Sequence, residues 1–459
     1  MSKNNSSFGR LNVLEIISSP EGRVCFLGVG GVSMSSLLVL SAHFGIRTLG
    51  VDGKDGEYIR ELMESGEDVR VGRRELPSDV KLLVYTLAAD ENDPMIREAE
   101  KRGVPCVSRA EYMSALSDAY RLKIAVSGTH GKSTVTAMLH HIFSRAALNP
   151  TTLSGARLGR GMCAYHVGSL DLFLYEACEY KDSFLAFDPS IALFLNLEYD
   201  HVDYFENEDQ LEESFLHAAE KAGHAMINAD DEKLLKIARK LHTPPIKVGK
   251  SIDCEYRYEP ISGAPSHPSA RFFRGEELLG EISLSLLGKF NLLNAVMACA
   301  CAVECGVDFS VCRRALAEFS GIPTRLERVG TWQGREIYFD YAHHPTEIKE
   351  GINAIKSDTG RALTVIFGPH TFSRTKVLFE DFVTALSLAD KLLITEIDAV
   401  REKMDDSISS ELLAKKTNGS VIRTEDELVA AISVSCGDIA VMGAADLGWV
   451  KELFLRNNY

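Results

Sequence analysis

Residues 123–138 constrain the fold of this 459-residue chain more than any other segment, because an apolar run there passes through a glycine loop into a helical pattern. Residues 124–126 are apolar enough for a buried strand, and Gly128 and Gly131 allow a turn whose backbone N–H groups face an anion. Lys132 follows directly, where a lysine can meet phosphate as a point charge. The segment therefore predicts a nucleotide-binding loop between a strand and a helix of an α/β fold.

The loop differs in one place from the common phosphate loop G-x-x-x-x-G-K-[ST], because Val126 stands where the first glycine would be. Ser133 keeps the hydroxyl that can ligate Mg²⁺. An ordinary glycine turn before a helix is the alternative interpretation, but such a turn does not require a Lys-Ser pair in this register. We therefore predict that nucleotide phosphates bind at Gly128, Thr129, His130, Gly131, Lys132, Ser133 and Thr134.

Polar side chains follow two later apolar runs. Glu176 follows residues 170–175, and Asp200 and His201 follow residues 191–197. Carboxylates and imidazoles at the carboxyl edge of a parallel sheet suit metal and nucleotide binding. Each of these residues alone would be explained better by a structural role, so the prediction of a site depends on their occurrence together with the phosphate loop.

A second glycine cluster lies near the start of the chain. A buried strand at 24–27 leads into the stretch GVGGVSM at 28–34, and a second strand at 47–51 ends at Asp52. This is the βαβ opening of a dinucleotide-binding fold, with an acidic residue where a ribose hydroxyl would be held. Ser33 replaces the third glycine of G-x-G-x-x-G, so the residues alone leave NAD, FAD and other pyrophosphates open.

Composition limits the class of protein. A chain of 459 residues with 45% hydrophobic residues is expected to fold as two or three domains. A formal charge of −15 argues against a nucleic-acid or anionic-membrane partner. No apolar run approaches the roughly 20 residues of a membrane span, and the polar start MSKNNSSFGR lacks the apolar core of a signal peptide. We therefore expect a cytoplasmic protein.

The cysteines show no CxxC pair. Cys299, Cys301, Cys305 and Cys312 occur in an alanine-rich helical pattern, where small buried thiols are a better interpretation than metal ligands. Reduced thiols also agree with a cytosolic protein.

Four further motifs follow in order along the second half of the chain. They are GKFNLLN at 288–294, PTRLE at 323–327, DYAHHPTE at 340–347 and PHTFSR at 369–374. Together with the loop GTHGKS, they make the chain resemble the Mur ligase family over nearly its whole length. Within that family, the chain is most similar to the branch that adds L-alanine.

The resemblance implies three α/β domains, and alternating strand and helix patterns agree with it. Residues 1–120 would form a Rossmann-like domain that binds a uridine diphosphate sugar. Residues 121–322 would form the central ATP-binding domain with a parallel sheet, and residues 323–459 a second Rossmann-like domain that binds the amino acid. Short β-like runs at 269–274 and 281–286 predict a small antiparallel side element of the central domain.

The resemblance also implies an ATP-dependent ligase that joins L-alanine to the lactoyl carboxylate of UDP-N-acetylmuramate in peptidoglycan precursor synthesis. The γ-phosphate of ATP would pass to the carboxylate, and the amine would attack the resulting acyl phosphate. Such a transfer depends on positioning and on neutralising negative charge. Mg²⁺ would be the cofactor, and the enzyme would act as a monomer or a homodimer.

The matching positions imply roles for individual residues. Catalysis would fall to Lys132, Glu176, His201 and Arg325, and Mg²⁺ would be held by Ser133, Glu176 and His201. The nucleotide site would include Arg325, with Asn291 and Asn294 on the adenine side and Asp340 at the ribose. The sugar nucleotide would bind at Gly28, Gly30, Gly31, Ser33, Met34 and Asp52, and the amino acid at His343, His344, His370 and Arg374.

Some positions depart from the family pattern. Phe215 stands fourteen residues after His201, where several sister ligases place a lysine that becomes carbamylated. The absence of that lysine matches the alanine-adding branch. Ala445 and Ser407 stand where the family usually has glycine, and Cys163 replaces an asparagine. The motif PTRLE is more like the other amide ligases of the family.

Three functions therefore remain in view. The first is alanine ligation, and the second is attachment of another amino acid or a recycled peptide to UDP-N-acetylmuramate. The third is a catalytically silent nucleotide-binding regulator. The amine that supports phosphate release separates the first two. The third is opposed by four intact residues, which are Lys132, Glu176, His201 and Arg325.

Overall fold

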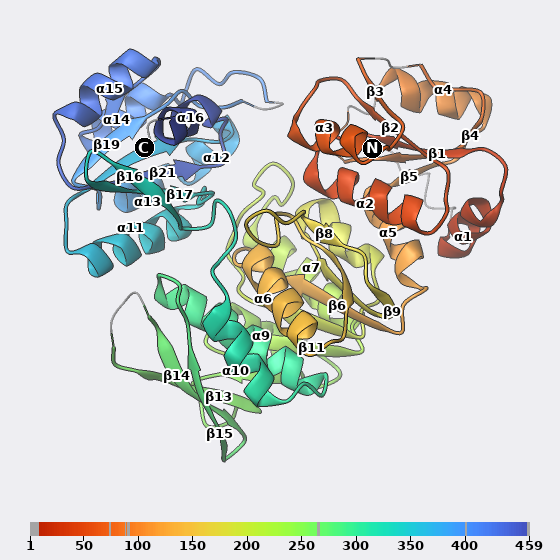
Figure 1. The fold of residues 1–459 in the computed structure, drawn as a ribbon, viewed down its shortest axis with the longest axis horizontal. Coiled ribbons are helices and arrows are strands. Elements are labelled where there is room, and N and C mark those ends of the chain that lie inside the picture. The colour runs from red at the N-terminus through yellow and green to blue at the C-terminus, as the bar shows by residue number, and fades with distance from the viewer. Residues whose placement is uncertain are drawn as a thin grey trace.

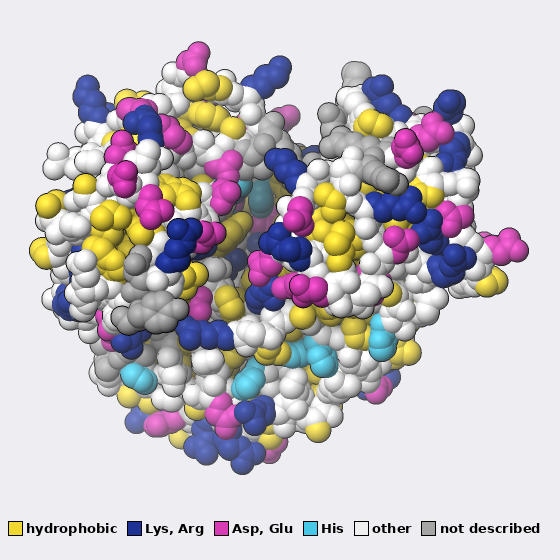
Figure 2. All heavy atoms as spheres, turned by 45° about the horizontal axis from the view of Figure 1, so that its top comes forward, with side chains coloured by type: hydrophobic (Ala, Val, Ile, Leu, Met, Phe, Trp, Pro, Cys, Tyr) yellow, Lys and Arg dark blue, Asp and Glu magenta, His cyan; other side chains and the backbone are white. Residues whose placement is uncertain are grey.

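Three β-sheets follow one another along the chain and form three lobes (Figure 1) around a hollow that Figure 2 shows from one side. The computed structural model describes residues 9–72, 75–87, 89, 92–263, 267–399 and 402–456. The first eight residues of the polar start therefore lie outside the described residues. The expected α/β fold with parallel-sheet cores is confirmed. Among the described residues, no helix is long and apolar enough to cross a lipid bilayer.

The first sheet has five parallel strands in the order β3-β2-β1-β4-β5. Its central strand β1 ends in four buried residues, as expected for a strand covered on both faces. The strands are β1 (Arg23–Leu27), β2 (Thr48–Asp52), β3 (Val69–Val71), β4 (Val80–Tyr85) and β5 (Cys106–Ser108). The helices are α1 (Arg10–Ser18), α2 (Val32–His43), α3 (Glu57–Glu64), α4 (Pro94–Arg102) and α5 (Arg109–Ser117).

The second sheet has ten strands in the order β15-β14-β13-β12-β11-β10-β6-β9-β7-β8. The strands are β6 (Leu122–Ser127), β7 (Pro150–Leu153), β8 (Tyr165–His166), β9 (Ser169–Glu176), β10 (Ile191–Phe194), β11 (His224–Asn228), β12 (Ile246–Gly249), β13 (Tyr256–Ile261), β14 (Ser269–Arg274) and β15 (Glu277–Ser283). The helices are α6 (Lys132–Arg145), the 3-10 helix η1 (Tyr180–Ala186), α7 (Glu208–Glu220), α8 (Glu232–Ala238), α9 (Lys289–Glu304) and α10 (Phe309–Glu318).

The antiparallel element expected beside this sheet is continuous with it. β13 pairs with β12 in parallel and with β14 in an antiparallel manner. The sequence did not predict β13, because Pro260 interrupts its pattern. β12 pairs only with Tyr256 and Arg257, so the missing N–H of Pro260 removes no hydrogen bond on that side. β15 begins at Glu277, earlier than expected, because the hairpin from β14 turns at Gly275.

The third sheet has six strands in the order β16-β17-β21-β18-β19-β20, and only β16 runs antiparallel to its neighbour. The central strands β18 and β21 are buried along their whole length. The strands are β16 (Glu327–Trp332), β17 (Arg335–Asp340), β18 (Leu363–Gly368), β19 (Lys391–Ile394), β20 (Ser420–Val421) and β21 (Asp438–Gly443). The helices are α11 (Pro345–Thr359), α12 (Phe372–Val377), α13 (Phe379–Leu386), α14 (Ser410–Thr417), α15 (Glu425–Ser433) and α16 (Gly448–Arg456).

The alanine-rich helix α9 packs against α6, the helix that begins at the phosphate loop. Its buried face carries small side chains such as Ala295 and Ala298, which let the two helices approach closely. Cys299, Cys301 and Cys312 are buried in the same core, as expected for structural thiols, whereas Cys305 is only partly buried at its edge. This packing fixes the start of α6 at the carboxyl edge of the central sheet.

Candidate active site

A cavity of about 350 Å³ lies where the central sheet faces the C-terminal lobe. The phosphate loop, the ends of β9 and β10, the first turns of α9 and the residues after β17 all line it. The predicted site residues that line it are Thr129, His130, Gly131, Lys132, Ser133, Thr134, Glu176, His201, Asn291, Asn294, Arg325, Asp340 and His343. Residues that are far apart in the sequence are thus brought to one place.

The phosphate loop adopts the backbone conformation that its glycines predict. Gly128 and Gly131 have φ angles of 134° and 83°, which favour glycine. A Cβ atom at Gly131 would lie 2.6 Å from Oδ1 of Asn294, so α9 also requires glycine there. The side chain of Asn196 makes two hydrogen bonds to the backbone of the loop. It accepts one from the N–H of His130 at 2.7 Å and donates one to the carbonyl oxygen of His130 at 3.1 Å.

Lys132 is paired inside the protein. Its Nζ donates to the carbonyl oxygens of Gly128 and Thr129 at 2.5 and 3.1 Å and lies 3.1 Å from Oε2 of Glu179. Burial acts to lower the pKa of Lys132. The neighbouring acidic groups, Glu179 above all, have the larger combined effect, so the pKa of the lysine is raised. Burial would likewise raise the pKa of Glu179, yet Lys132 and His201 lower it to about 2. The site therefore contains a fixed pair of opposite charges.

Glu176 and Glu179 occupy different places. Oε1 of Glu176 accepts hydrogen bonds from Ser154 Oγ at 2.7 Å and from the N–H of Gly155 at 2.6 Å. Glu179, which the sequence analysis did not single out, lies 3.6 Å from Nε2 of His201. Glu176 is the last residue of β9, and Glu179 comes three residues later. This E-x-x-E spacing is the signal that could have identified Glu179.

The two asparagines of α9 are buried and lie one turn apart. Asn294 Nδ2 donates to Oδ1 of Asn291 at 3.2 Å, and Asn291 Nδ2 donates to the carbonyl of Leu287 at 2.7 Å. These bonds fix the orientation of both amides at the edge of the cavity.

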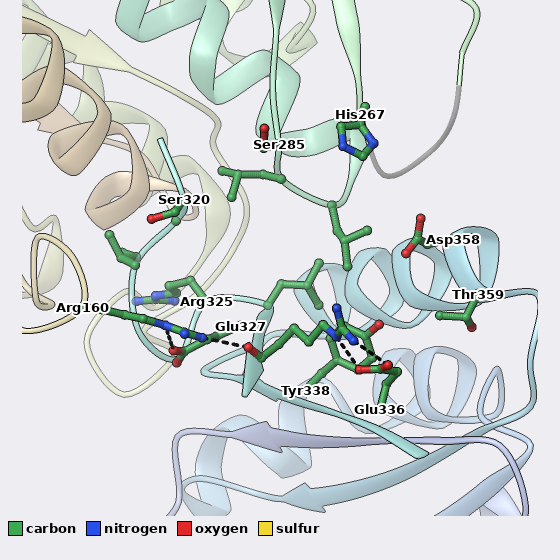
Figure 3. Close-up of a pocket in the computed structure, with 16 residues that line it drawn as sticks. Arg160, His267, Ser285, Ser320, Arg325, Glu327, Glu336, Tyr338, Asp358 and Thr359 are labelled. Carbon is green, nitrogen blue, oxygen red and sulfur yellow. Dashed lines mark hydrogen bonds and ion pairs between the residues drawn. The ribbon is translucent and has the colours of Figure 1, made fainter. Parts of the chain in front are cut away.

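The C-terminal lobe contributes a cation and a buried carboxyl group. The guanidinium of Arg325 lies over the ring of Tyr341, 4.9 Å from its centroid. Burial raises the pKa of Asp340 to about 7, and the negative charge of Glu347 adds to this shift. Figure 3 shows that Arg325 also borders an adjoining hollow of about 390 Å³, in which Arg160 bonds Glu327 at 2.9 Å.

Of the residues predicted to bind the amino acid, His343 lines the cavity, whereas His344, His370 and Arg374 are not part of its lining. Arg374 forms a two-pronged ion pair with Asp200 of the central domain, with Nε–Oδ1 and Nη2–Oδ2 distances of 2.9 and 3.1 Å. Nδ1 of His370 lies 3.4 Å from Nη1 of the same arginine, and Nδ1 of His343 lies 2.9 Å from the carbonyl of Tyr341. The guanidinium holds the pKa of Asp200 far below its usual range although burial opposes this.

His130 links the phosphate loop to the C-terminal lobe. Its Nδ1 lies 3.1 Å from Oε1 of Glu347, and its Nε2 lies 3.5 Å from Oε2 of Glu198. Although burial opposes protonation, these two carboxylates raise the pKa of His130 to about 10. His344 lies on the other side of Glu198, at 3.4 Å between Nδ1 and Oε2.

The N-terminal glycine cluster lines a separate cavity of about 530 Å³. Gly28, Gly31, Ser33, Met34 and Asp52 all line it. Gly30 supports the loop instead, since its N–H donates to Oδ2 of Asp52 at 2.8 Å. The cavity also includes Arg109, which the sequence analysis missed and whose pKa is lowered by burial.

Comparison with known proteins accounts for all three lobes. The model described as "Mur ligase family, catalytic domain" matches residues 23–121, "Mur ligase middle domain" matches 126–302, and "Mur ligase, glutamate ligase domain" matches 324–445. A UDP-N-acetylmuramate–L-alanine ligase of Caldicellulosiruptor bescii is 35% identical over 445 residues, which are 94% of this chain and 98% of that protein. The chain belongs to the Mur ligase family.

Other Mur ligases agree. Proteins with the same name from Clostridium novyi and Aquifex aeolicus are 33% and 34% identical over 95% and 94% of this chain, and over 97% and 96% of their own length. The crystal structure of UDP-N-acetylmuramate–alanine ligase from Thermotoga maritima shares the fold with a TM-score of 0.80 at 24% identity, covering 95% of this chain and 98% of that one. A murein peptide ligase from Psychrobacter arcticus shares it with a TM-score of 0.72 at 21% identity, covering the same shares.

The structure describes the surroundings of three positions that depart from the Mur ligase pattern. Phe215 is fully buried and packs edge-on against Phe184 at 5.3 Å between ring centroids. A lysine could not be accommodated in that apolar contact without leaving a charge buried. Ser407 donates to Oδ1 of Asp405 at 2.6 Å, and Cys163 is exposed.

Proposed function

We propose that this Mur ligase uses ATP to join L-alanine to the lactoyl carboxylate of UDP-N-acetylmuramate, by way of an acyl phosphate, in peptidoglycan precursor synthesis. Relatives that carry this name match the chain over nearly all of its length. The observation that supports the proposal most is the shared cavity, in which the phosphate loop faces Arg325 of the next lobe. A silent nucleotide-binding protein has no need of that arrangement.

The chain's own residues supply the parts that phosphoryl transfer requires. The turn at Gly128 and Gly131 places backbone N–H groups and the start of α6 toward the cavity, where they bind phosphate oxygens. Lys132 and Arg325 bring positive charge from two sides. Because negative charge spreads over the transferred group, this charge acts most strongly in the transition state.

The donor set fits Mg²⁺, which prefers oxygen ligands and neutralises the charge of the phosphates when bound. Ser133 and Glu176 line the cavity with a hydroxyl and a carboxylate, and His201 lines it with an imidazole. Glu179, next to His201, is a further carboxylate that could serve the same ion. We therefore keep Ser133, Glu176 and His201 as proposed ligands and add Glu179.

The nucleotide and the amino acid would bind on the C-terminal side. Asn291 and Asn294 would meet the adenine, and Asp340 the ribose. For the amino acid, Arg374 offers five N–H donors, of which Asp200 takes two, so the guanidinium can still meet a carboxylate. The remaining proposed contacts of the amino acid are His343, His344 and His370.

The sugar nucleotide would bind in the N-terminal cavity, and Arg109 there would add positive charge for the pyrophosphate. Residues 1–120, 121–322 and 323–459 would then be the three domains that bind UDP-N-acetylmuramate, ATP and alanine. The proposed substrates place the reaction in the cytoplasm, with the enzyme as a monomer or homodimer.

Phosphate release tests this function. The full-length protein is supplied with ATP, Mg²⁺ and UDP-N-acetylmuramate, and only the amine is varied among L-alanine, glycine, L-serine and a muropeptide-type peptide. We expect L-alanine to give the highest kcat/KM. Release with the peptide but not with L-alanine would assign the chain to the recycling type of ligase. Absence of release with every amine would overturn the proposal.

A further inference from the structure

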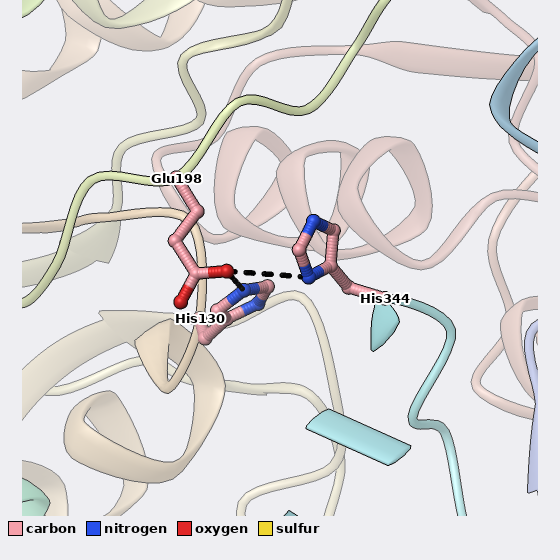
Figure 4. Close-up of side chains that lie close together, drawn as sticks. All are labelled: His130, Glu198 and His344. Atoms are coloured by element: carbon pink, nitrogen blue, oxygen red, sulfur yellow. Dashed lines mark ion pairs between the residues drawn. The ribbon is translucent and has the colours of Figure 1, made fainter. Parts of the chain in front are cut away.

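His130, Glu198 and His344 form a compact group that phosphoryl transfer does not require as a unit (Figure 4). His130 comes from the phosphate loop, Glu198 follows β10, and His344 is the residue that caps the start of α11. One ligand atom from each residue lies within 4.8 Å of the other two. The group therefore spans the contact between the central and C-terminal lobes.

The distances within the group suit a small tetrahedral metal ion. Oε2 of Glu198 lies 3.5 Å from Nε2 of His130 and 3.4 Å from Nδ1 of His344. Zinc binds nitrogen and oxygen at about 2.0–2.1 Å, so two ligand atoms of a tetrahedral site lie about 3.3–3.4 Å apart. Two edges of the group already have nearly this length. The two imidazole rings lie 4.7 Å apart at an angle of 47°, so they are not stacked face to face.

A second observation concerns the far side of His130. Its Nδ1 lies 3.1 Å from Oε1 of Glu347, which is the carboxylate–histidine arrangement that orients metal-binding imidazoles. A metal ion at Nε2 would displace the proton of that nitrogen, and the contact with Glu347 would hold the remaining proton at Nδ1 while Nε2 stays directed toward Glu198. Within the described residues, Nε2 of His130 is buried and makes no hydrogen bond.

Two other groups contact the same atoms. The N–H of Thr346 donates to Nδ1 of His344 at 3.3 Å, and its hydroxyl donates to Oε2 of Glu198 at 2.5 Å. The first bond is long, and a metal ion at Nδ1 would replace it. Glu198 and Glu347 together carry two negative charges, which match a divalent cation once His130 is neutral.

We propose that Nε2 of His130, Oε2 of Glu198 and Nδ1 of His344 form a binding site for a zinc-type divalent cation, which fastens the C-terminal lobe to the phosphate loop. Two imidazoles and one carboxylate select Zn²⁺, Co²⁺ or Ni²⁺ over Mg²⁺, which prefers oxygen ligands. The ion is thus distinct from the Mg²⁺ of the proposed reaction.

Metal titration of the chelator-treated full-length protein tests the site. We expect one Zn²⁺ per chain by calorimetry, and the intense visible absorption of four-coordinate Co²⁺ when cobalt is used instead. His344→Asn and Glu198→Gln should each weaken Zn²⁺ binding at least tenfold. His242→Asn is the matched control, since His242 also pairs with a glutamate, Glu220 at 2.9 Å, but is exposed and distant in sequence from the site. Equal affinity in all four proteins would overturn the proposal.

X-ray absorption of the zinc-loaded unaltered protein gives an independent answer, which holds even when a variant fails to fold. We expect only nitrogen and oxygen neighbours at about 2.0–2.1 Å, with imidazole scattering from two rings. Sulfur neighbours at about 2.3 Å would show that cysteines bind the ion instead. That result, or no binding at 100-fold excess of Zn²⁺ over protein, would contradict the site.

Discussion

Lys132 is held in place before any nucleotide arrives. Two loop carbonyls and the carboxylate of Glu179 take up its three N–H donors, so the side chain loses little freedom when phosphate binds. Glu179 in turn depends on Lys132 and His201 for its charge, since it is almost fully buried. The chemistry of the loop is thus a property of a charged cluster and not of the lysine alone.

Replacement of the lysine tests its role in charge neutralisation. Lys132→Ala should lower kcat at least about a hundredfold, because the transferred phosphoryl group loses a fixed positive charge. Circular dichroism should show an unchanged fold. Lys123→Ala is the control, since Lys123 lies on the strand before the loop. Its Nζ pairs with Oδ1 of Asp118 at a distance of 3.1 Å, and neither residue lines the cavity. Turnover within a few-fold of the parent in a folded Lys132→Ala protein would refute the role.

Asp340 predicts a pH dependence of stability. Its pKa of about 7 in the folded protein lies above the value of about 3.9 for an unfolded chain. The folded state therefore holds the proton more tightly, and the free energy of unfolding falls as the pH rises from about 4 to about 7. Asp340→Asn cannot ionise, so the difference between its unfolding temperature and that of the parent should increase by several degrees from pH 5 to pH 8. An unchanged difference across that range would contradict the buried carboxyl group.

At the scale of elements, the phosphate loop depends on the helix behind it. α9 places Asn294 against Gly131, so the turn into α6 has room for a hydrogen atom only. The packing of α9 on α6 and the φ angle of Gly131 therefore act together to set the direction of the loop's N–H groups.

A matched pair of glycine substitutions separates these effects. Gly131→Ala should lower kcat at least tenfold, because its Cβ would meet Asn294 at 2.6 Å in addition to the strain of a φ of 83°. Gly45→Ala imposes similar strain, at a φ of 77°, but its Cβ meets nothing within 4 Å. Its activity should be normal and its stability slightly reduced. Equal activity in the two variants would show that the contact with Asn294 does not matter.

The elements also show where sequence patterns were sufficient. Strand β6 and helix α6 follow the apolar run and the glycine loop as predicted, because local sequence determines both. Strand β13 was missed, since its Pro260 is tolerated only through the limited pairing with β12. The pair of Arg374 and Asp200 joins residues 174 positions apart, and no local pattern reports such a contact. Glu179 was not singled out, because its place beside Lys132 and His201 becomes apparent only when the chain folds.

At the scale of the whole molecule, several polar contacts join the central and C-terminal lobes, and three of them are ion pairs far apart in the sequence. Arg374 pairs with Asp200, His130 pairs with Glu347, and Arg160 bonds Glu327. The proposed ATP site takes residues from both lobes, so neither lobe alone can complete it. Movement of the lobes would therefore control access to the cavity.

Arg325 tests this dependence. Arg325→Ala should lower kcat far more than it lowers the affinity for UDP-N-acetylmuramate, because a guanidinium beside the transferred group acts mainly in the transition state. Arg325→Lys should not restore the full rate, since a point charge does not reproduce the planar fork. Arg328→Ala is the control, because Arg328 lies on the nearby β16 and pairs with Glu336 outside the proposed site. A near-normal kcat in Arg325→Ala would mean that the C-terminal lobe does not complete the site.

Isotope transfer tests the central claim most directly. UDP-N-acetylmuramate labelled with ¹⁸O in its lactoyl carboxylate is turned over with ATP, Mg²⁺ and L-alanine, and the released phosphate is examined by mass spectrometry. If the carboxylate oxygen attacks the γ-phosphorus and the amine then expels phosphate, each phosphate released carries one carboxylate oxygen. We predict this transfer, together with the alanine amide as product. Phosphate without ¹⁸O from a fully labelled carboxylate would contradict ligation through an acyl phosphate.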